Sequence, residues 1–386
     1  MKISDYVESQ IKGLWGTDFD ENGISVIKTN NLTYEGHIDY SDICKRNITE
    51  EQAKGWYLKP GDLLIEKSGG TKTHSVGYVS YFEGEEDKFV CNNFILALRP
   101  KNTINSKFLF YQIQFKYESN QFSDCFNKTT GIQNLKVKDY LAKEIKIYSP
   151  EKQEKIVKEL DTVRSIINKN KQILKKYDTL IKSRFIEMFG TEKDFNKWPC
   201  CKVQDIANVL VGVVIKPTQY YCEKGVPTFR SLNVGELYVN DSDWVYFTEE
   251  GNTKNKKSIL KENDVLVVRS GAPGKSCVIT KKYEGYNAVD VIIAHPNLEK
   301  INPVFLSMFT NMPHGMNQIK AKTGGAAQQH FNVGGYNSLN IILPPLKLQN
   351  DFASFVQQID KSKFAVQKSL EKAETLYKSL MQEYFG

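Results

Sequence analysis

Two long stretches of the chain carry apolar residues in a heptad pattern. The spacing alternates between four and three residues, so the side chains fall on one stripe of a helix. In the first stretch the stripe consists of Ile156, Leu160, Val163, Ile167, Asn170, Leu174, Tyr177, Ile181, Arg184 and Met188. In the second stretch it consists of Phe352, Val356, Ile359, Lys363, Val366, Leu370, Ala373, Tyr377, Leu380 and Tyr384. Both stripes are mostly apolar.

Each stripe predicts a long helix that needs a partner. Prolines precede both stretches, and Gly190 and Gly386 end them. A helix of about 38 residues rises about 57 Å, which is too long for one small domain to cover. We therefore expect the helices at 148–190 and 344–386 to pair antiparallel about a pseudo-two-fold axis. The alternative is that each stripe packs on its own domain.

The segments upstream of the two helices, 1–147 and 191–343, carry a different pattern. Short apolar runs such as DLLIEKS, FILALRP, DVLVVRS and DVIIAHP are separated by Gly, Asn, Pro and charged residues, which is typical of strands and turns. Helical patterns appear at 106–115 and 303–312. We therefore expect two globular domains of α/β or α+β class.

The chain repeats itself with a period of about 196 residues. Sliding 137–190 onto 333–386 without a gap matches Tyr140 with Tyr336, and both segments end in Phe-Gly. Upstream, GDLLIEKSGG matches NDVLVVRSGA and INSKFL matches INPVFL. We predict a tandem α/β (α+β) repeat, with two globular domains separated by a long antiparallel two-helix coiled coil. The upstream parts diverge more, as expected of two variable readers on one scaffold or of drift after duplication.

The charge of the chain favours a polyanionic partner. Its 386 residues carry a formal charge of +7 with a pI near 8.7, which suits nucleic acid without requiring it. No run of about 18 apolar residues and no signal sequence is present, so we expect a cytoplasmic protein that does not enter a membrane. The seven cysteines form no CxxC pair, which argues against a zinc site.

The patterns that would indicate catalysis are incomplete. Gly274-Lys275-Ser276 resembles the end of a phosphate-binding loop, but Arg269 stands where the first glycine should be. A nuclease-like pattern before Lys67 has Ile65 in place of its second carboxylate, and the histidines show no spacing suited to a metal or a triad. We expect no catalytic residue and no metal site. Two alternatives stay open: a non-enzymatic coiled-coil scaffold that binds protein partners, and a stand-alone nuclease.

Several phrases together resemble the specificity subunits of type I restriction-modification systems. These are the twofold repeat, the helix starts Pro150-Glu151-Lys152-Gln153 and Pro345-Leu346-Lys347-Leu348-Gln349, the helix ends at FG, and the phrases GDLLIEKSGG and VPTFRSLNV…NDVLVVRSGAPG. The resemblance covers essentially the whole chain. The first unit departs at 13–16, where the second unit has 208–214, so the two readers are expected to be of different subtypes.

The resemblance implies a non-catalytic DNA-binding subunit that takes part in defence against foreign DNA. Two target-recognition domains, 1–147 and 191–343, would each read half of a split site in double-stranded DNA. Two methyltransferase subunits, which bring S-adenosylmethionine, and restriction subunits, which use ATP and Mg²⁺, would dock on this chain. None of these cofactors is expected to bind the chain itself.

Candidate DNA contacts lie in glycine-bearing loops, where short polar groups and the backbone can approach DNA closely. In the first domain they are Lys67, Ser68, Lys72, Lys128, Thr129, Thr130 and Gln133. In the second domain they are Arg230, Asn233, Arg269, Ser270, Lys275, Lys322, Thr323, Gln328 and Gln329. Gln133 and the pair at 328–329 occupy equivalent places in the repeat, which favours these two loops.

Overall fold

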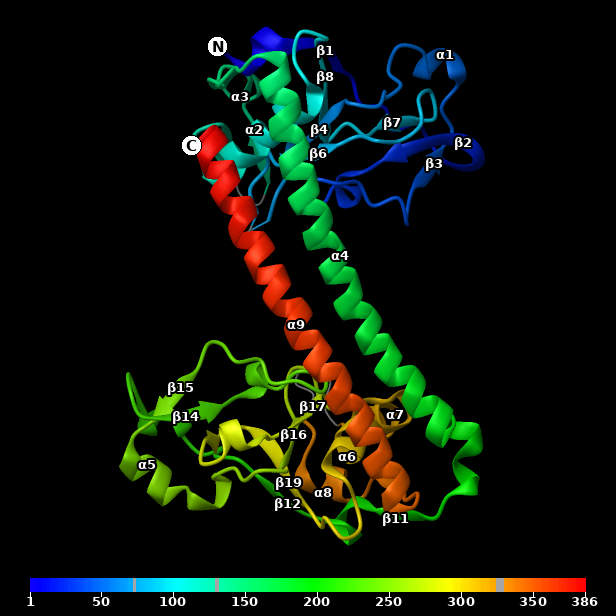
Figure 1. Cartoon of the computed structure of the whole chain (residues 1–386). Coiled ribbons are helices and arrows are strands. Elements are labelled where there is room, and N and C mark those ends of the chain that lie inside the picture. Colours follow the sequence, from blue (N-terminus) through cyan, green and yellow to red (C-terminus); the bar gives the residue numbers. More distant parts are fainter. Residues whose placement is uncertain (72–73, 129–131, 324–329) are drawn as a thin grey trace. The chain divides into compact units, whose positions relative to one another are not determined.

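The computed structural model of the chain forms two compact units (Figure 1). It describes residues 1–71, 74–128, 132–323 and 330–386. Unit 1 comprises Met1–Lys171 and Lys368–Gly386, and unit 2 comprises Gln172–Gln367. Each unit therefore contains one globular domain and parts of both long helices.

A four-stranded antiparallel sheet forms the centre of unit 1. Its strands are, in spatial order, β1 (Val7–Ile11), β8 (Ile95–Pro100), β4 (Leu63–Glu66) and β6 (Val79–Tyr81). Side chains alternate between the faces of a strand, and Leu63 and Ile65 accordingly join one buried cluster while Leu64 joins another. Helix α2 (Ser106–Glu118) covers the face on which Leu63 and Ile65 lie.

Two smaller sheets and several short helices complete the globular domain of unit 1. In one sheet, the central β2 pairs antiparallel with β3 and parallel with β7; in the other, β10 lies between β5 and β9. The strands are β2 (Phe19–Ile27), β3 (Cys44–Arg46), β5 (Ser68–Gly69), β7 (Phe89–Cys91), β9 (Phe126–Lys128) and β10 (Gln133–Leu135). The short helices are η1 (Ile3–Tyr6), η2 (Thr29–Asn31), α1 (Glu50–Ala53) and α3 (Val137–Leu141).

Unit 2 repeats this topology, as the sequence repeat predicts. Its main sheet has the order β12, β19, β16, β17, and its second sheet again combines an antiparallel pair with one parallel partner. The strands are β11 (Cys200–Lys202), β12 (Ala207–Val211), β13 (Tyr221–Cys222), β14 (Val226–Phe229), β15 (Val245–Phe247), β16 (Val265–Val268), β17 (Ser276–Val278), β18 (Asn287–Ala288), β19 (Val291–Pro296) and β20 (Asn340–Ile342). The mostly antiparallel pairing makes the domain α+β.

The α-helices in the globular domain of unit 2 also follow those of unit 1, with one addition. Helix α6 contributes to the core of unit 2 as α2 does in unit 1, and α7 has no counterpart among the described residues of unit 1. The helices are α5 (Glu249–Lys254), α6 (Pro303–Asn311), α7 (Pro313–Ala321) and α8 (Val333–Asn337). The 3-10 helices are η3 (Glu192–Lys197), η4 (Val203–Asp205), η5 (Pro217–Tyr220), η6 (Ser231–Asn233), η7 (Lys256–Ser258) and η8 (Lys281–Tyr283).

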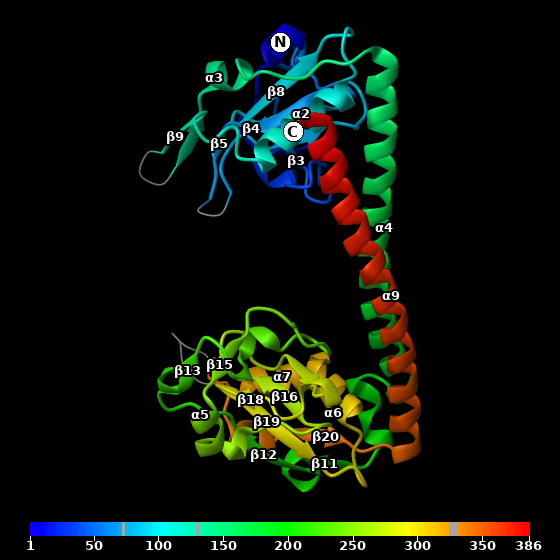
Figure 2. The same ribbon diagram turned by 60° about the vertical axis from the view of Figure 1, so that its left-hand side comes forward.

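The two long helices, α4 (Pro150–Phe189) and α9 (Leu346–Phe385), contact each other within each unit. In unit 1, the Asn170 amide donates to Ser369 Oγ at 3.1 Å, and the Tyr384 hydroxyl donates to a Glu159 carboxylate oxygen. In unit 2, Lys363 Nζ lies 2.5 Å from the carboxylate of Asp178. Positions later in α4 contact positions earlier in α9, so the segments run antiparallel in each unit (Figures 1 and 2).

Most residues of the predicted apolar stripes are buried. Fully or nearly buried are Ile156, Leu160, Val163, Ile167, Asn170, Ile181, Phe352, Val356, Ile359, Leu370 and Ala373. Partly buried are Leu174, Tyr177, Val366, Tyr377 and Leu380. Near the carboxyl end of each helix the buried positions move one residue along, to Phe185, Phe189, Met381 and Phe385. A period of 3.6 residues drifts away from a strict heptad, and there each helix packs into the core of a domain.

A buried glutamine fixes the start of each long helix. Gln153 Oε1 accepts the backbone N–H of Asn105 at 3.0 Å, and its amide donates to the carbonyl of Tyr148 at 2.8 Å. Gln349 makes the equivalent bonds, to the N–H of Asn302 at 2.9 Å and to the carbonyl of Pro344 at 2.8 Å. The side chain thus ties each helix start to the residue that caps α2 or α6, which explains why a glutamine stands at both positions.

A carboxylate that is almost completely buried precedes β4 in the main sheet of unit 1 and β16 in the main sheet of unit 2. Asp62 accepts two hydrogen bonds from Arg99, at 2.7 and 2.9 Å. Burial raises the pKa of Asp62, and the hydrogen bonds from Arg99 and the Lys59 backbone oppose that shift. In unit 2, Asp264 instead contacts His295 Nδ1 at 2.5 Å. The position is the same in both units, and the partner is an arginine in one and a histidine in the other.

Two general expectations can also be compared with the structure. None of the described helices is long and apolar enough to span a bilayer. The seven cysteines are free thiols, three of them buried, and none forms a disulfide.

Candidate nucleic-acid interface

In unit 1, strand pairing brings several predicted DNA-contacting residues to one edge of the domain. Lys67 joins β4 to β5, and its carbonyl accepts the N–H of Leu135 at 2.8 Å. Ser68 pairs with Asn134 in the sheet, and its hydroxyl donates to Asn134 Oδ1 at 2.7 Å. We call this contact between the two loops the clasp of unit 1, made by Lys67, Ser68, Asn134 and Leu135. Figure 2 shows its strand β5 near β9.

Unit 2 contains the same clasp. The carbonyl of Arg269 accepts the N–H of Phe331 at 2.9 Å, as Lys67 accepts that of Leu135. Ser270 forms an isolated β-bridge with His330, and its hydroxyl lies 2.9 Å from His330 Nδ1. The clasp of unit 2 consists of Arg269, Ser270, His330 and Phe331. Two loops that sequence analysis treated separately, 269–275 and 322–330, are therefore joined at its base.

The side chain of Gln133 supports a loop and does not point freely outward. Its Oε1 accepts the N–H of Val76 at 3.2 Å, and a Cβ at Gly70 would lie 3.1 Å from its amide carbon. Gly70 has a φ of +72°, which glycine adopts without strain. Gln133 therefore helps to hold Gly70 and Val76 in place, and its predicted contact with DNA stays a prediction.

Glu66 lies beneath the clasp of unit 1. Burial raises the pKa of this carboxyl group, and the N–H of Gly70, which it accepts at 3.4 Å, opposes the rise. A Cβ at Gly69 would come within 2.6 Å of Glu66 Oε1, and the φ of Gly69 is +131°. Both glycines have a positive φ, which residues with a side chain rarely adopt, so the GG pair in the sequence serves the backbone conformation of this loop.

Asn233 is fully buried, so the prediction that it contacts DNA is wrong for the folded chain. Its amide donates to the carbonyls of Asn240 and Ser242, and its Oδ1 accepts the N–H of Arg230. Asn31, at the end of η2, makes the corresponding bonds in unit 1. The residue stabilises a turn in both copies because its amide satisfies three backbone groups at once.

The remaining candidates in unit 2 differ in how far they are committed to internal contacts. Arg230 forms an ion pair with Asp243 at 3.0 Å, at the edge of the second sheet and outside the clasp. The Thr323 hydroxyl donates to the carbonyl of Ile319 at 2.6 Å. Lys275 and Lys322 are exposed. These two lysines are the candidates whose charge is most available to a phosphate.

Some predicted contacts cannot be placed. Lys72, Thr129, Thr130, Gln328 and Gln329 lie outside the described residues, and Lys128 is described only by its backbone, which pairs with Gln133. They stay predictions.

Sequence analysis missed two residues that lie next to the clasps. Phe94 in unit 1 and Asp290 in unit 2 each stand directly before the last strand of the main sheet. The N–H groups of Lys67 and Ser68 both donate to the Phe94 carbonyl, and the side chain of Arg269 donates to Asp290. Aligning FILALRP with DVIIAHP at the strand could have revealed this shared position.

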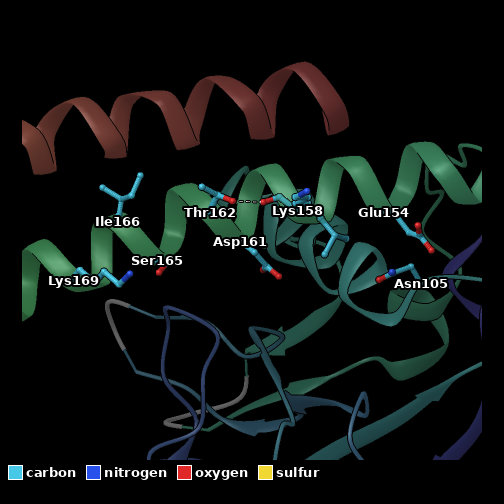
Figure 3. Close-up of a pocket in the computed structure, with 9 residues that line it drawn as sticks. Asn105, Glu154, Lys158, Asp161, Thr162, Ser165, Ile166 and Lys169 are labelled. Atoms are coloured by element: carbon cyan, nitrogen blue, oxygen red, sulfur yellow. Dashed lines mark hydrogen bonds between the residues drawn. The ribbon is translucent and has the colours of Figure 1, made fainter.

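A groove along α4 in unit 1 is another concave feature with polar side chains (Figure 3). It is lined by Asn105, Glu154, Val157, Lys158, Asp161, Thr162, Ser165, Ile166 and Lys169. Acidic and basic residues alternate along it, and Lys107 pairs with Asp161 at 3.2 Å. No group of three metal-ligating side chains occurs among the described residues.

The chain is similar to known proteins along most of its length. The model of the type I restriction modification DNA specificity domain matches residues 4–177 and 196–374. The EcoKI specificity subunit of Escherichia coli K12 is 24% identical, covering 94% of this chain and 82% of that protein, and the StySPI specificity subunit of Salmonella potsdam is 23% identical, covering 93% and 80%.

Solved structures share the fold. An S subunit of a type I restriction-modification system from M. genitalium is 14% identical, covers 100% of this chain and 95% of its own, and has a TM-score of 0.60. A chain from a structure concerning assembly of the type I system has a TM-score of 0.53 at 15% identity, with 100% and 96% coverage. The chain therefore belongs to the type I restriction modification DNA specificity family and carries two copies of its domain.

Proposed function

We propose that this chain is the DNA-reading subunit of a type I restriction-modification complex, and that each unit reads one half of a split site. The observation that carries the proposal is the clasp, which recurs in both units with an equivalent backbone hydrogen bond and an equivalent β-bridge and with different side chains. A scaffold that keeps its hydrogen bonds while its exposed residues vary is suited to reading two different sequences.

The clasps and their loops supply the chemistry that DNA recognition needs. Lysines such as Lys67, Lys275 and Lys322, together with Ser68 and Ser270, would hold phosphates, and arginine would read base edges in the major groove. Lys72, Lys128, Thr129, Thr130, Thr323, Gln328 and Gln329 stay candidates in the same loops. We propose no cofactor for this chain.

The partners would dock on the long helices. Helix α4 leaves Ile166, Ile173 and Leu180 exposed at intervals of seven residues. A seven-residue interval of apolar side chains is the pattern by which one helix packs against another. We propose that helices of two methyltransferase subunits cover these residues, and that restriction subunits join the complex with them. S-adenosylmethionine, ATP and Mg²⁺ would bind to those subunits, and the complex would act in the cytoplasm.

The test is co-expression of the chain with a type I methyltransferase subunit from the same genome, followed by mapping of methylated bases. A split motif with a constant spacer is the expected result. A chain that binds no DNA even within its assembled complex would be a protein-binding scaffold. Cleavage of a plasmid by the isolated chain with Mg²⁺ would identify a nuclease and contradict the proposal.

A further inference from the structure

The side chain of Arg269 is held in a fixed position at the clasp of unit 2. Its Nη1 donates to Asp290 Oδ1 at 3.0 Å, and only 19% of the side chain is exposed. Its Nε is buried without a hydrogen-bond partner, and the guanidinium donates no other hydrogen bond within the described residues. An unpaired buried N–H is unfavourable, and Arg184 and Arg230 also bury an Nε without a partner, so this feature alone does not single out Arg269.

Asp290 adopts a backbone conformation that residues other than glycine rarely take. Its φ is +51°, in the turn between β18 and β19, and 41% of its side chain is exposed. The carboxylate lies on one side of the guanidinium and leaves the Nη2 group without a partner. A planar guanidinium held on one side and with spare donors is suited to donating hydrogen bonds to the O6 and N7 acceptors of guanine.

Arg230 and Asp243 form a similar pair elsewhere in unit 2, so the pairing alone does not indicate DNA contact. The position of Arg269 at the clasp is what favours a contact with DNA. It follows the central strand directly, and its backbone holds Phe331 as that of Lys67 holds Leu135. Both units therefore place a cation at the same point of the clasp. In unit 1, however, the neighbour is Phe94, which is 54% exposed, and not a carboxylate.

We infer that Arg269 reads a guanine in the half-site of unit 2, and that Asp290 positions its guanidinium for that contact. This inference rests on the proposed function. It adds to that function the base that Arg269 contacts and the residue that positions the arginine. It also places this guanine contact in unit 2 alone.

The experiment maps methylated motifs made by the assembled complex with the wild-type chain and with Arg269→Lys, Arg269→Ala and Asp290→Asn. Arg269→Lys keeps the charge but loses the fork, so the preference for one G·C pair should fall about tenfold or more. Arg269→Ala should do the same, and Asp290→Asn should relax the same position to a smaller degree. The other half-site should not change.

The matched control is Arg99→Lys, which removes a planar arginine from its carboxylate in unit 1, away from the clasp. It should leave the motif unchanged, and thermal unfolding of each variant shows that the chain still folds. If the Arg269 variants relax no position, or a position that is not a G·C pair, the inference is overturned while the split motif stands. If the wild-type chain gives no split motif, the proposed function fails with it.

Discussion

The two units differ most clearly at one residue of the main sheet, which stands directly before β8 in unit 1 and directly before β19 in unit 2. It is Phe94 in unit 1, beside Lys67, and Asp290 in unit 2, beside Arg269. One backbone hydrogen bond of the clasp is common to both units, since Leu135 and Phe331 donate to equivalent carbonyls. The comparison indicates that the scaffold of the clasp is shared while the chemistry presented there has diverged. Two units with such different side chains should read half-sites of different sequence.

The largest effect should come from the shared helical scaffold. Leu160 on α4 is completely buried in the core of unit 1. Leu160→Ala should lower the free energy of unfolding by about 2–5 kcal/mol, because it removes apolar contacts and leaves a cavity. Hydrogen exchange should locate the loss in unit 1. Ile166→Ala on the same helix, where the side chain is 43% exposed, is the control and should change stability by less than about 0.5 kcal/mol.

The two buried glutamines should behave alike if the units share their scaffold. Gln153→Ala and Gln349→Ala each leave a backbone N–H and a carbonyl without their partner. We expect each to lower the free energy of unfolding by about 1–3 kcal/mol, measured by chemical denaturation. If only one of the two variants lost stability, the equivalent hydrogen bonds would not contribute equally to the stability of the two units.

Phe94 should affect only the half-site of unit 1. An exposed aromatic ring beside a cation can contact the methyl group of thymine. Phe94→Ala should therefore weaken binding by about 1 kcal/mol and alter one half of the methylated motif. The folded state should change little, because more than half of the ring is exposed. A change in the half-site of unit 2 would break the comparison between the units.

The smallest effect concerns a contact that contributes to DNA affinity but not to sequence preference. Lys275 is exposed in the loop that follows the clasp of unit 2. Lys275→Ala should reduce the salt dependence of DNA binding by about one unit of slope in a plot of log K against log salt, with the motif unchanged. Binding measured at several salt concentrations tests this. An unchanged slope would remove the lysine from the interface.

The sequence allowed the architecture to be predicted because the repeat and the heptads depend on local spacing. The stripes from Ile156 to Ile181 and from Phe352 to Ala373 needed no knowledge of tertiary contacts. The ends were less predictable, since Phe189 and Phe385 are buried in the cores of the domains, where Phe189 also packs against Phe352 of the paired helix. Tertiary contacts also decided the candidate site. Asn233 is polar, so no local pattern predicts that it is buried. Arg269 and Asp290 are distant in sequence, so no local pattern reveals that they pair.

The central claim is that each unit reads its own half of one split site. The most direct measurement compares the methylated motifs of the complex containing the wild-type chain, Arg269→Lys and Phe94→Ala. We predict two half-motifs at a constant spacing, with the Arg269 variant relaxing one half and the Phe94 variant altering the other. A single continuous motif, or a variant in one unit that alters both halves, would contradict the account.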